Sequence, residues 1–215
     1  MTSRHRARFD HDPDAAGYDA DVADETQPIR AGYEELLGWV ATRADVGRRM
    51  SVLDLGAGTG NLTVRLRAAR ALTAVDSSAR MLEIARTKCG ARLATVQDDL
   101  LGYFASEPRF DRIVSTYAIH HLEDDEKRTL FEKIRGALLA GGSAIFGDLM
   151  FASVAARDEA RRSFAARGAT DVVEAIDDEF FWLLDDAVPA LLSCGFRVET
   201  RRFSELSWGV CCRLV

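Results

Sequence analysis

The sequence predicts an α/β domain in which helices cover both faces of a seven-stranded, mostly parallel sheet. Three observations support this prediction. Short apolar runs alternate with amphipathic segments, a glycine-rich turn follows the first central run, and long connections separate the first five runs. Strands that are joined by such crossovers lie parallel to one another.

The segment 51–76 contains the unit around which the domain is organised. A short apolar run over 51–55 predicts a buried strand. Three glycines follow at every second position: Gly56, Gly58 and Gly60. A helix is expected to start over 62–66, and a second apolar run over 71–75 ends in Asp76.

This unit predicts a site for a ligand that carries a nucleoside. Glycines allow a positive φ and a close approach of the ligand to the backbone, and a helix N-terminus attracts negative charge. Asp76, at the tip of the neighbouring strand, is placed to accept hydrogen bonds from both hydroxyls of a ribose. A dinucleotide fingerprint would need a third glycine at position 61, where the chain has Asn61, and this disfavours an NAD(P)-dependent oxidoreductase.

The sequence LDLGAGTGN, from Leu53 to Asn61, resembles motif I of the class I S-adenosylmethionine (SAM)-dependent methyltransferases. The runs VSTYAIHHLEDDEKRTLF and IFGDLMF are similar to those of the small bacterial YrrT-like branch of these enzymes. The resemblance implies a Rossmann-like fold with an antiparallel last strand, and SAM as the cofactor. It also implies methyl transfer to a nucleophile on a small molecule. A SAM-binding regulator or pseudoenzyme without turnover is the alternative.

The resemblance further implies a set of cofactor-binding residues. An acid directly after the third strand, expected over 92–96, accepts a hydrogen bond from the adenine amino group. Asp99 fits this position and Asp98 is its rival, although an aspartate here could also cap the next turn. The expected cofactor-binding residues are Asp54, Gly56, Ala57, Gly58, Gly60, Asn61, Asp76, Ser77, Met81, Asp98, Asp99, Leu100 and Ser115.

The acceptor pocket is expected beyond the carboxyl ends of the fourth and fifth strands, over 110–122 and 145–151. His120 in that place could orient or deprotonate a nucleophile, or it could be a packed turn histidine. The predicted catalytic residues are His120, Asp148, Tyr18 and Tyr117, with Phe151 as a further wall. No metal is expected, because no second ligand cluster accompanies His120 and His121 at a recognisable spacing.

Tyr18 belongs to FDHDPDAAGYD, over 9–19, which resembles the FDxxAxxYD segment of small-molecule methyltransferases with extra residues around Pro13. In those relatives the tyrosine closes over the methyl end of the cofactor, whereas the alternative is that Tyr18 packs this segment onto the domain. We therefore expect residues 1–26 to form a tail with a cofactor-closing segment. Residues 27–215 should form a single domain.

The remaining helices and strands follow from apolar periodicity. Helices are expected over 27–43, 79–88 and 123–139, and closing strands over 196–203 and 208–215. Gly141 is expected directly after the third of these helices as its C′ residue. The long connection over 152–189 is predicted to be a lid-like insertion, which is expected to roof the acceptor pocket as far as Trp182.

Composition and charge restrict the class of protein. The net charge of −6, without a basic cluster, argues against nucleic acid as a partner. The four cysteines lack CxxC spacing, and the adjacent Cys211 and Cys212 should point to opposite faces of a strand. Neither a run of 18 apolar residues nor a signal peptide is recognisable, so a cytoplasmic protein without a membrane span is expected. The sequence does not indicate an oligomeric state.

Overall fold

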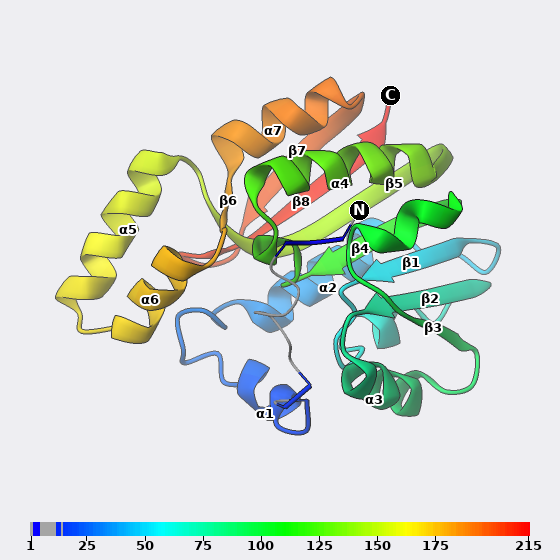
Figure 1. The fold of residues 1–215 in the computed structure, drawn as a ribbon, viewed down its shortest axis with the longest axis horizontal. Coiled ribbons are helices and arrows are strands. Elements are labelled where there is room, and N and C mark those ends of the chain that lie inside the picture. The colour runs from blue at the N-terminus through cyan, green and yellow to red at the C-terminus, as the bar shows by residue number, and fades with distance from the viewer. Residues whose placement is uncertain (1, 5–11, 14) are drawn as a thin grey trace.

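The computed structural model describes residues 2–4, 12–13 and 15–215. Seven of its eight strands form one sheet in the order β3-β2-β1-β4-β5-β8-β7, and β6 pairs with β5 alone (Figure 1). The strands are β1 (Ser51–Leu55), β2 (Ala71–Asp76), β3 (Leu93–Gln97), β4 (Phe110–Thr116), β5 (Leu138–Phe151), β6 (Trp182–Leu183), β7 (Phe196–Arg202) and β8 (Ser207–Leu214). The strand missing from the predicted seven is β6, which is too short to leave a pattern in the sequence.

The strand directions agree with the prediction. Strands β1 to β5 run parallel to one another, and β8 is antiparallel to both β5 and β7. The order reverses between β1 and β4, since the chain first adds β2 and β3 on one side and then β4 and β5 on the other. Ligands of open α/β sheets bind at such a switch point, beyond the carboxyl ends of the strands.

The helices differ in several places from the expected segments. The structure contains α1 (Tyr18–Val22), α2 (Tyr33–Ala44), α3 (Ala79–Cys89), α4 (Asp124–Ala137), α5 (Val154–Ala166), α6 (Thr170–Asp178) and α7 (Leu184–Ser193). It also contains the short 3₁₀ helices η1 (Thr63–Leu66), η2 (Gly102–Ser106) and η3 (Ile119–His121). The helix that was expected after the glycine turn is thus a single 3₁₀ turn. The strand expected over 110–122 ends at Thr116.

The prediction that Gly141 follows a helix as its C′ residue is wrong. Helix α4 starts in a capping box formed by Glu123 and Glu126, and it ends at Ala137. Gly141 instead lies within β5, where its φ of +75° fits a glycine.

Two helical layers cover the sheet, as predicted. Helices α2 and α3 pack on one face, while α4 and α7 pack on the other (Figure 1). Cys211 belongs to the first layer of buried side chains and Cys212 to the second, which confirms that they point to opposite faces. Within the described part of the chain, no helix has the length and apolar character that crossing a membrane requires.

The long connection over 152–189 contains two different parts. Helices α5 and α6 form a pair that projects beyond the edge of the sheet (Figure 1). Trp182 is fully buried between Phe131 and Phe146, and α7 then packs on the sheet next to α4. The α5–α6 pair therefore extends past the ends of the strands, although its Phe164, Val172 and Ile176 are buried with the α2 layer, and Trp182 belongs to the core between the sheet and α4.

Candidate active site

A cavity of about 230 Å³ lies beyond the carboxyl ends of the central strands. Most of the predicted site residues line it: Tyr18, Gly56, Ala57, Gly58, Asn61, Asp76, Ser77, Met81, Asp98, Asp99, Leu100, Tyr117 and His120. The cavity therefore joins the expected cofactor segments and the end of β4 in one space, at the switch point of the sheet.

The glycine turn forms the floor of the cavity between β1 and β4. Gly56 has a φ of +69°, and a Cβ atom on it would lie 2.3 Å from the Cβ atom of Ala118. No larger residue fits at this position, because both the backbone conformation and the space require glycine. A Cβ atom on Gly60 would instead lie 3.0 Å from Ala85 of α3, so this glycine serves packing behind the cavity.

Asp76 connects the glycine turn to the start of α3. Its Oδ2 atom accepts a hydrogen bond from the backbone N–H of Gly58 at 2.8 Å, and its Oδ1 atom accepts one from Ser78 at 2.9 Å. The Ser78 hydroxyl in turn accepts the N–H of Met81 and caps the helix. The carboxylate of Asp76 thus shapes the turn as well as lining the cavity.

Asp99 lines the cavity and has one carboxylate oxygen without a hydrogen-bond partner. Its Oδ1 atom accepts hydrogen bonds from the backbone N–H groups of Leu101 and Gly102 at 2.8 and 2.9 Å, so Asp99 does cap the next turn. Its Oδ2 atom is buried and has no hydrogen-bond partner. A buried oxygen in this state favours a ligand that brings a donor. The Oδ1 atom of the rival Asp98 already accepts the N–H of Asp99.

Three of the predicted cofactor-binding residues lie behind the wall and do not line the cavity. Besides Gly60, these are Asp54 and Ser115, which are both almost fully buried. The hydroxyl of Thr63 donates to Asp54 at 2.5 Å, and that of Ser115 donates to the carbonyl of Leu55 at 2.6 Å. Burial raises the pKa of Asp54 to about 7 despite the hydrogen bond from Thr63.

Tyr18 reaches the cavity from the N-terminal segment. Its ring lies against the glycine turn, 4.0 Å from a Cβ atom built on Gly58, and the guanidinium of Arg30 lies 5.9 Å from the ring centroid. The next residue, Asp19, anchors the segment through Lys88 and Thr59, both at 2.6 Å. Of the segment that resembles FDxxAxxYD, residues 9–11 and 14 lie outside the described part of the chain.

Tyr117 stands at the end of β4 in an uncommon backbone conformation. Its φ is +50°, which is rare for a residue with a side chain and is typical of sites with a function. Its hydroxyl lies 3.0 Å from that of Ser207, and its ring centroid lies 5.3 Å from that of Tyr33. Burial raises the pKa of Tyr117, so the phenol stays neutral and forms an aromatic wall.

His120 occupies the cavity wall next to Tyr117, and Asp148 holds it from behind. The His120 Nδ1 atom lies 2.5 Å from Asp148 Oδ1. Asp148 also accepts the backbone N–H groups of Ile119, His120 and Leu149 at 2.9 to 3.1 Å. Asp148 and Phe151 are buried and do not line the cavity, in contrast to the prediction that they form part of its wall.

The protein-family model described as a methyltransferase domain matches residues 52–142. An uncharacterized methyltransferase of Geobacillus thermodenitrificans (strain NG80-2) is 31% identical over 199 residues, which cover 92% of this chain and 89% of the relative. Another from Bacillus cereus (strain ATCC 10987 / NRS 248) is 32% identical over 195 residues, with 89% and 90% covered. The chain belongs to the class I SAM-dependent methyltransferases.

Solved structures share the fold of this methyltransferase. DhpI, in a complex with S-adenosylhomocysteine (SAH), aligns over 98% of this chain and 93% of its own with a TM-score of 0.68 and 21% identity. The N-methyltransferase NodS from Bradyrhizobium japonicum WM9, also in complex with SAH, aligns over 87% and 88% with a TM-score of 0.61 and 18% identity. At sequence identities this low, the similarity shows a shared fold and nothing about the substrate.

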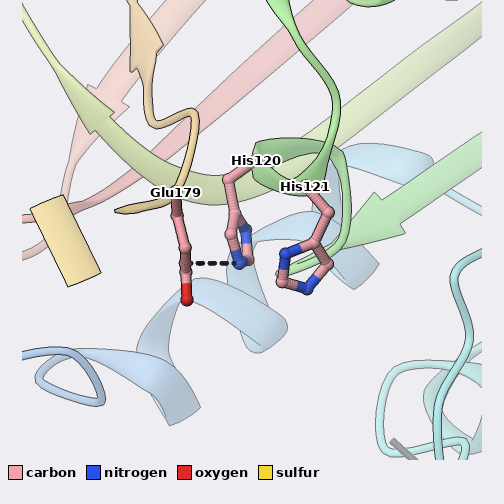
Figure 2. Close-up of side chains that lie close together, drawn as sticks. All are labelled: His120, His121 and Glu179. Atoms are coloured by element: carbon pink, nitrogen blue, oxygen red, sulfur yellow. Dashed lines mark ion pairs between the residues drawn. The ribbon is translucent and has the colours of Figure 1, made fainter. Parts of the chain in front are cut away.

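Sequence reasoning missed two charged residues of the methyltransferase cavity, Glu179 and Arg30. Glu179 follows α6, and its Oε2 atom lies 3.3 Å from His120 Nε2 (Figure 2). Phe180 donates its N–H to the carbonyl of His120 at 3.0 Å, and its own carbonyl accepts Lys127 Nζ at 2.6 Å. No pattern in the sequence relates these positions, because the fold alone brings the end of α6 to η3.

Two carboxylates determine the charge of His120 in the methyltransferase. Burial lowers the pKa of the imidazole, but the charges of Asp148 and Glu179 outweigh this effect, and the pKa is raised overall. Because Asp148 engages Nδ1, the Nε2 atom is the one that faces the cavity and Glu179.

Proposed function

We propose that this methyltransferase transfers the methyl group of SAM to a nucleophilic atom of a metabolite-sized acceptor, and that it belongs to the YrrT-like branch. One observation carries the proposal: the residues that were predicted to bind the nucleoside and His120 line one and the same cavity. Side chains from separate segments, Tyr18, Tyr33 and Glu179, wall this cavity, which favours a small acceptor. Protein and nucleic-acid acceptors need an open surface, and the net charge of −6 also disfavours nucleic acid.

In this proposal, the ends of β1, β2 and β3 hold SAM. The turn from Gly56 to Gly58 receives the amino-acid part, where a side chain on Gly56 would close the space. Asp76 accepts the ribose hydroxyls, and the unpartnered Oδ2 atom of Asp99 accepts the adenine amino group. SAM supplies an electrophilic methyl group on a sulfonium sulfur.

The other half of the cavity receives the acceptor. Tyr18 and Tyr117 provide aromatic walls, which suit a group that carries partial positive charge. His120 is the side chain that polarises the acceptor, and Asp148 is a positioning residue that fixes the orientation of its ring. Methyl transfer depends mainly on in-line geometry, and positioning alone can lower such a barrier by about 7–11 kcal/mol.

The proposal is tested in two steps. The protein is first incubated with SAM and a mixture of metabolites, and the formation of SAH is measured. With the acceptor identified, His120→Ala and Asp148→Asn should each lower the methyl-transfer rate about tenfold or more while SAM affinity changes little. Asparagine keeps an oxygen for the backbone N–H groups that Asp148 binds, so it disturbs the turn less than alanine would.

Glu159→Gln, at an exposed position of α5, is the matched control and should leave the rate unchanged. Unchanged rates in both site variants would contradict the placement of the acceptor. Tight SAM binding without SAH formation from any metabolite would instead support a SAM-binding regulator.

A further inference from the structure

We propose that His120, His121 and Glu179 bind one divalent transition-metal ion, with zinc as the best match, at the acceptor end of the cavity. Each of these residues offers one ligand atom, and the three atoms lie within 4.8 Å of one another (Figure 2). Two imidazoles with one carboxylate form a ligand set that zinc and other first-row divalent ions prefer.

The distances are close to those that a bound ion needs. Zinc bonds to nitrogen and oxygen at about 2.0–2.2 Å, so the ligand atoms of a tetrahedral site lie about 3.4 Å apart. The His120 Nε2 and Glu179 Oε2 atoms already lie 3.3 Å apart. The third ligand atom belongs to His121, at the end of η3, and it lies within 4.8 Å of the other two.

The residues behind the three ligands prepare His120 for coordination. Asp148 engages Nδ1 at 2.5 Å, so Nε2 is the ring nitrogen that faces Glu179 and the cavity and is available to a metal ion. Metal-binding histidines usually donate their second N–H to a carboxylate in this way, and the contact fixes both the tautomer and the ring orientation. The backbone N–H groups of Ile119 and His120 in turn hold Asp148.

A backbone hydrogen bond fixes the position of Glu179, and the nearby cation is already bound by other groups. The N–H of Phe180 bonds to the carbonyl of His120 at 3.0 Å, so the backbone itself places Glu179 beside the imidazole. Lys127 is the buried cation nearby, but its ammonium group is bound by Asp124 at 3.0 Å and by the carbonyl of Phe180 at 2.6 Å. The carboxylates of Asp148 and Glu179 therefore flank the imidazole and favour a cation between the ligands.

All three ligands line the cavity, so a bound ion would have an open coordination position there. This step rests on the proposed function. The open coordination position of the ion selects methyl acceptors that carry a hydroxyl or thiol group. The ion lowers the pKa of that group, and its proton leaves to water. The acceptor oxygen or sulfur then forms a bond to the methyl carbon as the carbon–sulfur bond of the donor breaks, and the electron pair of that bond stays on the donor sulfur.

The test measures metal binding directly. The full-length protein is freed of metal with a chelator and titrated with Co²⁺, followed by its visible absorption, and zinc binding is measured by equilibrium dialysis. One ion should bind per chain, without the intense charge-transfer band of a cysteine thiolate. Glu179→Gln and His121→Asn should each weaken binding about tenfold or more, whereas Glu174→Gln, on the exposed side of α6, should not.

SAM affinity is measured for every variant and should equal that of the parent protein, which shows that the fold is intact. Absence of a bound ion in the parent, or equal metal affinity in Glu179→Gln and His121→Asn, would overturn the proposed site. Metal binding that responds to both substitutions, in a protein that forms no SAH, would confirm the site and count against the proposed methyl transfer.

Discussion

Replacing Asp54 by asparagine should remove a dependence of stability on pH between about pH 4 and 7. Asp54 lies on β1 and is almost fully buried, with one carboxylate oxygen bound by Thr63 and the other without a partner. Burial, with a contribution from the charge of Asp76, raises its pKa from 3.8 to about 7. The folded protein therefore keeps a proton on Asp54 at pH values where the unfolded chain has lost it.

The magnitude follows from this shift. A shift of about three pKa units corresponds to about 4 kcal/mol, since each unit is worth about 1.4 kcal/mol. Because the pKa is raised in the folded state, the stability that Asp54 contributes is complete below about pH 4 and is lost as the pH rises to about 7. The free energy of unfolding of the parent, relative to that of Asp54→Asn, should fall by about 1.4 kcal/mol per pH unit between pH 5 and 6.5.

Urea denaturation of parent and variant at pH 5, 6, 7 and 8 measures the difference between their free energies of unfolding. Both proteins contain the same histidines, so the effects of histidine titration cancel in this difference. Asp111→Asn is the matched control, because hydrogen bonds from Ser51 lower the pKa of Asp111. The stability that Asp111 contributes is lost only in acid, below about pH 4. The difference in the free energy of unfolding between Asp111→Asn and the parent should therefore not change between pH 5 and 8. A flat difference for Asp54→Asn as well would refute the account of a protonated buried carboxyl group.

The two remaining predictions concern SAM affinity, measured by calorimetry. Asp76→Ala should weaken binding at least about tenfold, since each hydrogen bond to a charged group is worth roughly 1.5–3 kcal/mol and the variant also releases the N–H of Gly58 from its partner. Equal affinity would contradict the ribose contact. Asp99→Ala should weaken binding of SAM more than binding of an analogue that lacks the exocyclic amine. If both ligands weaken alike, Asp98 or the backbone holds the adenine.

The strand order around β1 and the position of the cavity could be predicted from local patterns. The glycine turn, with Asp76 about 20 residues further along, has a backbone geometry that few other sequences satisfy. Gly56 shows why: its conformation and the 2.3 Å approach of Ala118 both exclude any other residue. Where the physical constraint is local in the sequence, as it is here, the prediction succeeds.

Elements that depend on distant partners could not be predicted in the same way. Strand β6 has two residues and exists because Trp182 and Leu183 pair with Met150 and Phe151 at the end of β5. The length of the connection over 152–189 led to the prediction of a lid that reaches as far as Trp182, whereas the fold buries that side chain in the core. An aromatic residue in a long connection has the same signature in either place, so only the tertiary structure distinguishes the two.

The same argument applies to the acceptor end of the cavity. His120 and His121 are neighbours in the sequence, and without a further ligand at a recognisable spacing they did not suggest a metal site. In an α/β fold, however, the segments that follow different strands and helices meet at one edge of the sheet. Glu179 reaches His120 because the N–H of Phe180 pairs with the carbonyl of His120. Since spacing along the chain carries no information about such a contact, the chemistry of this edge has to be derived from the folded structure.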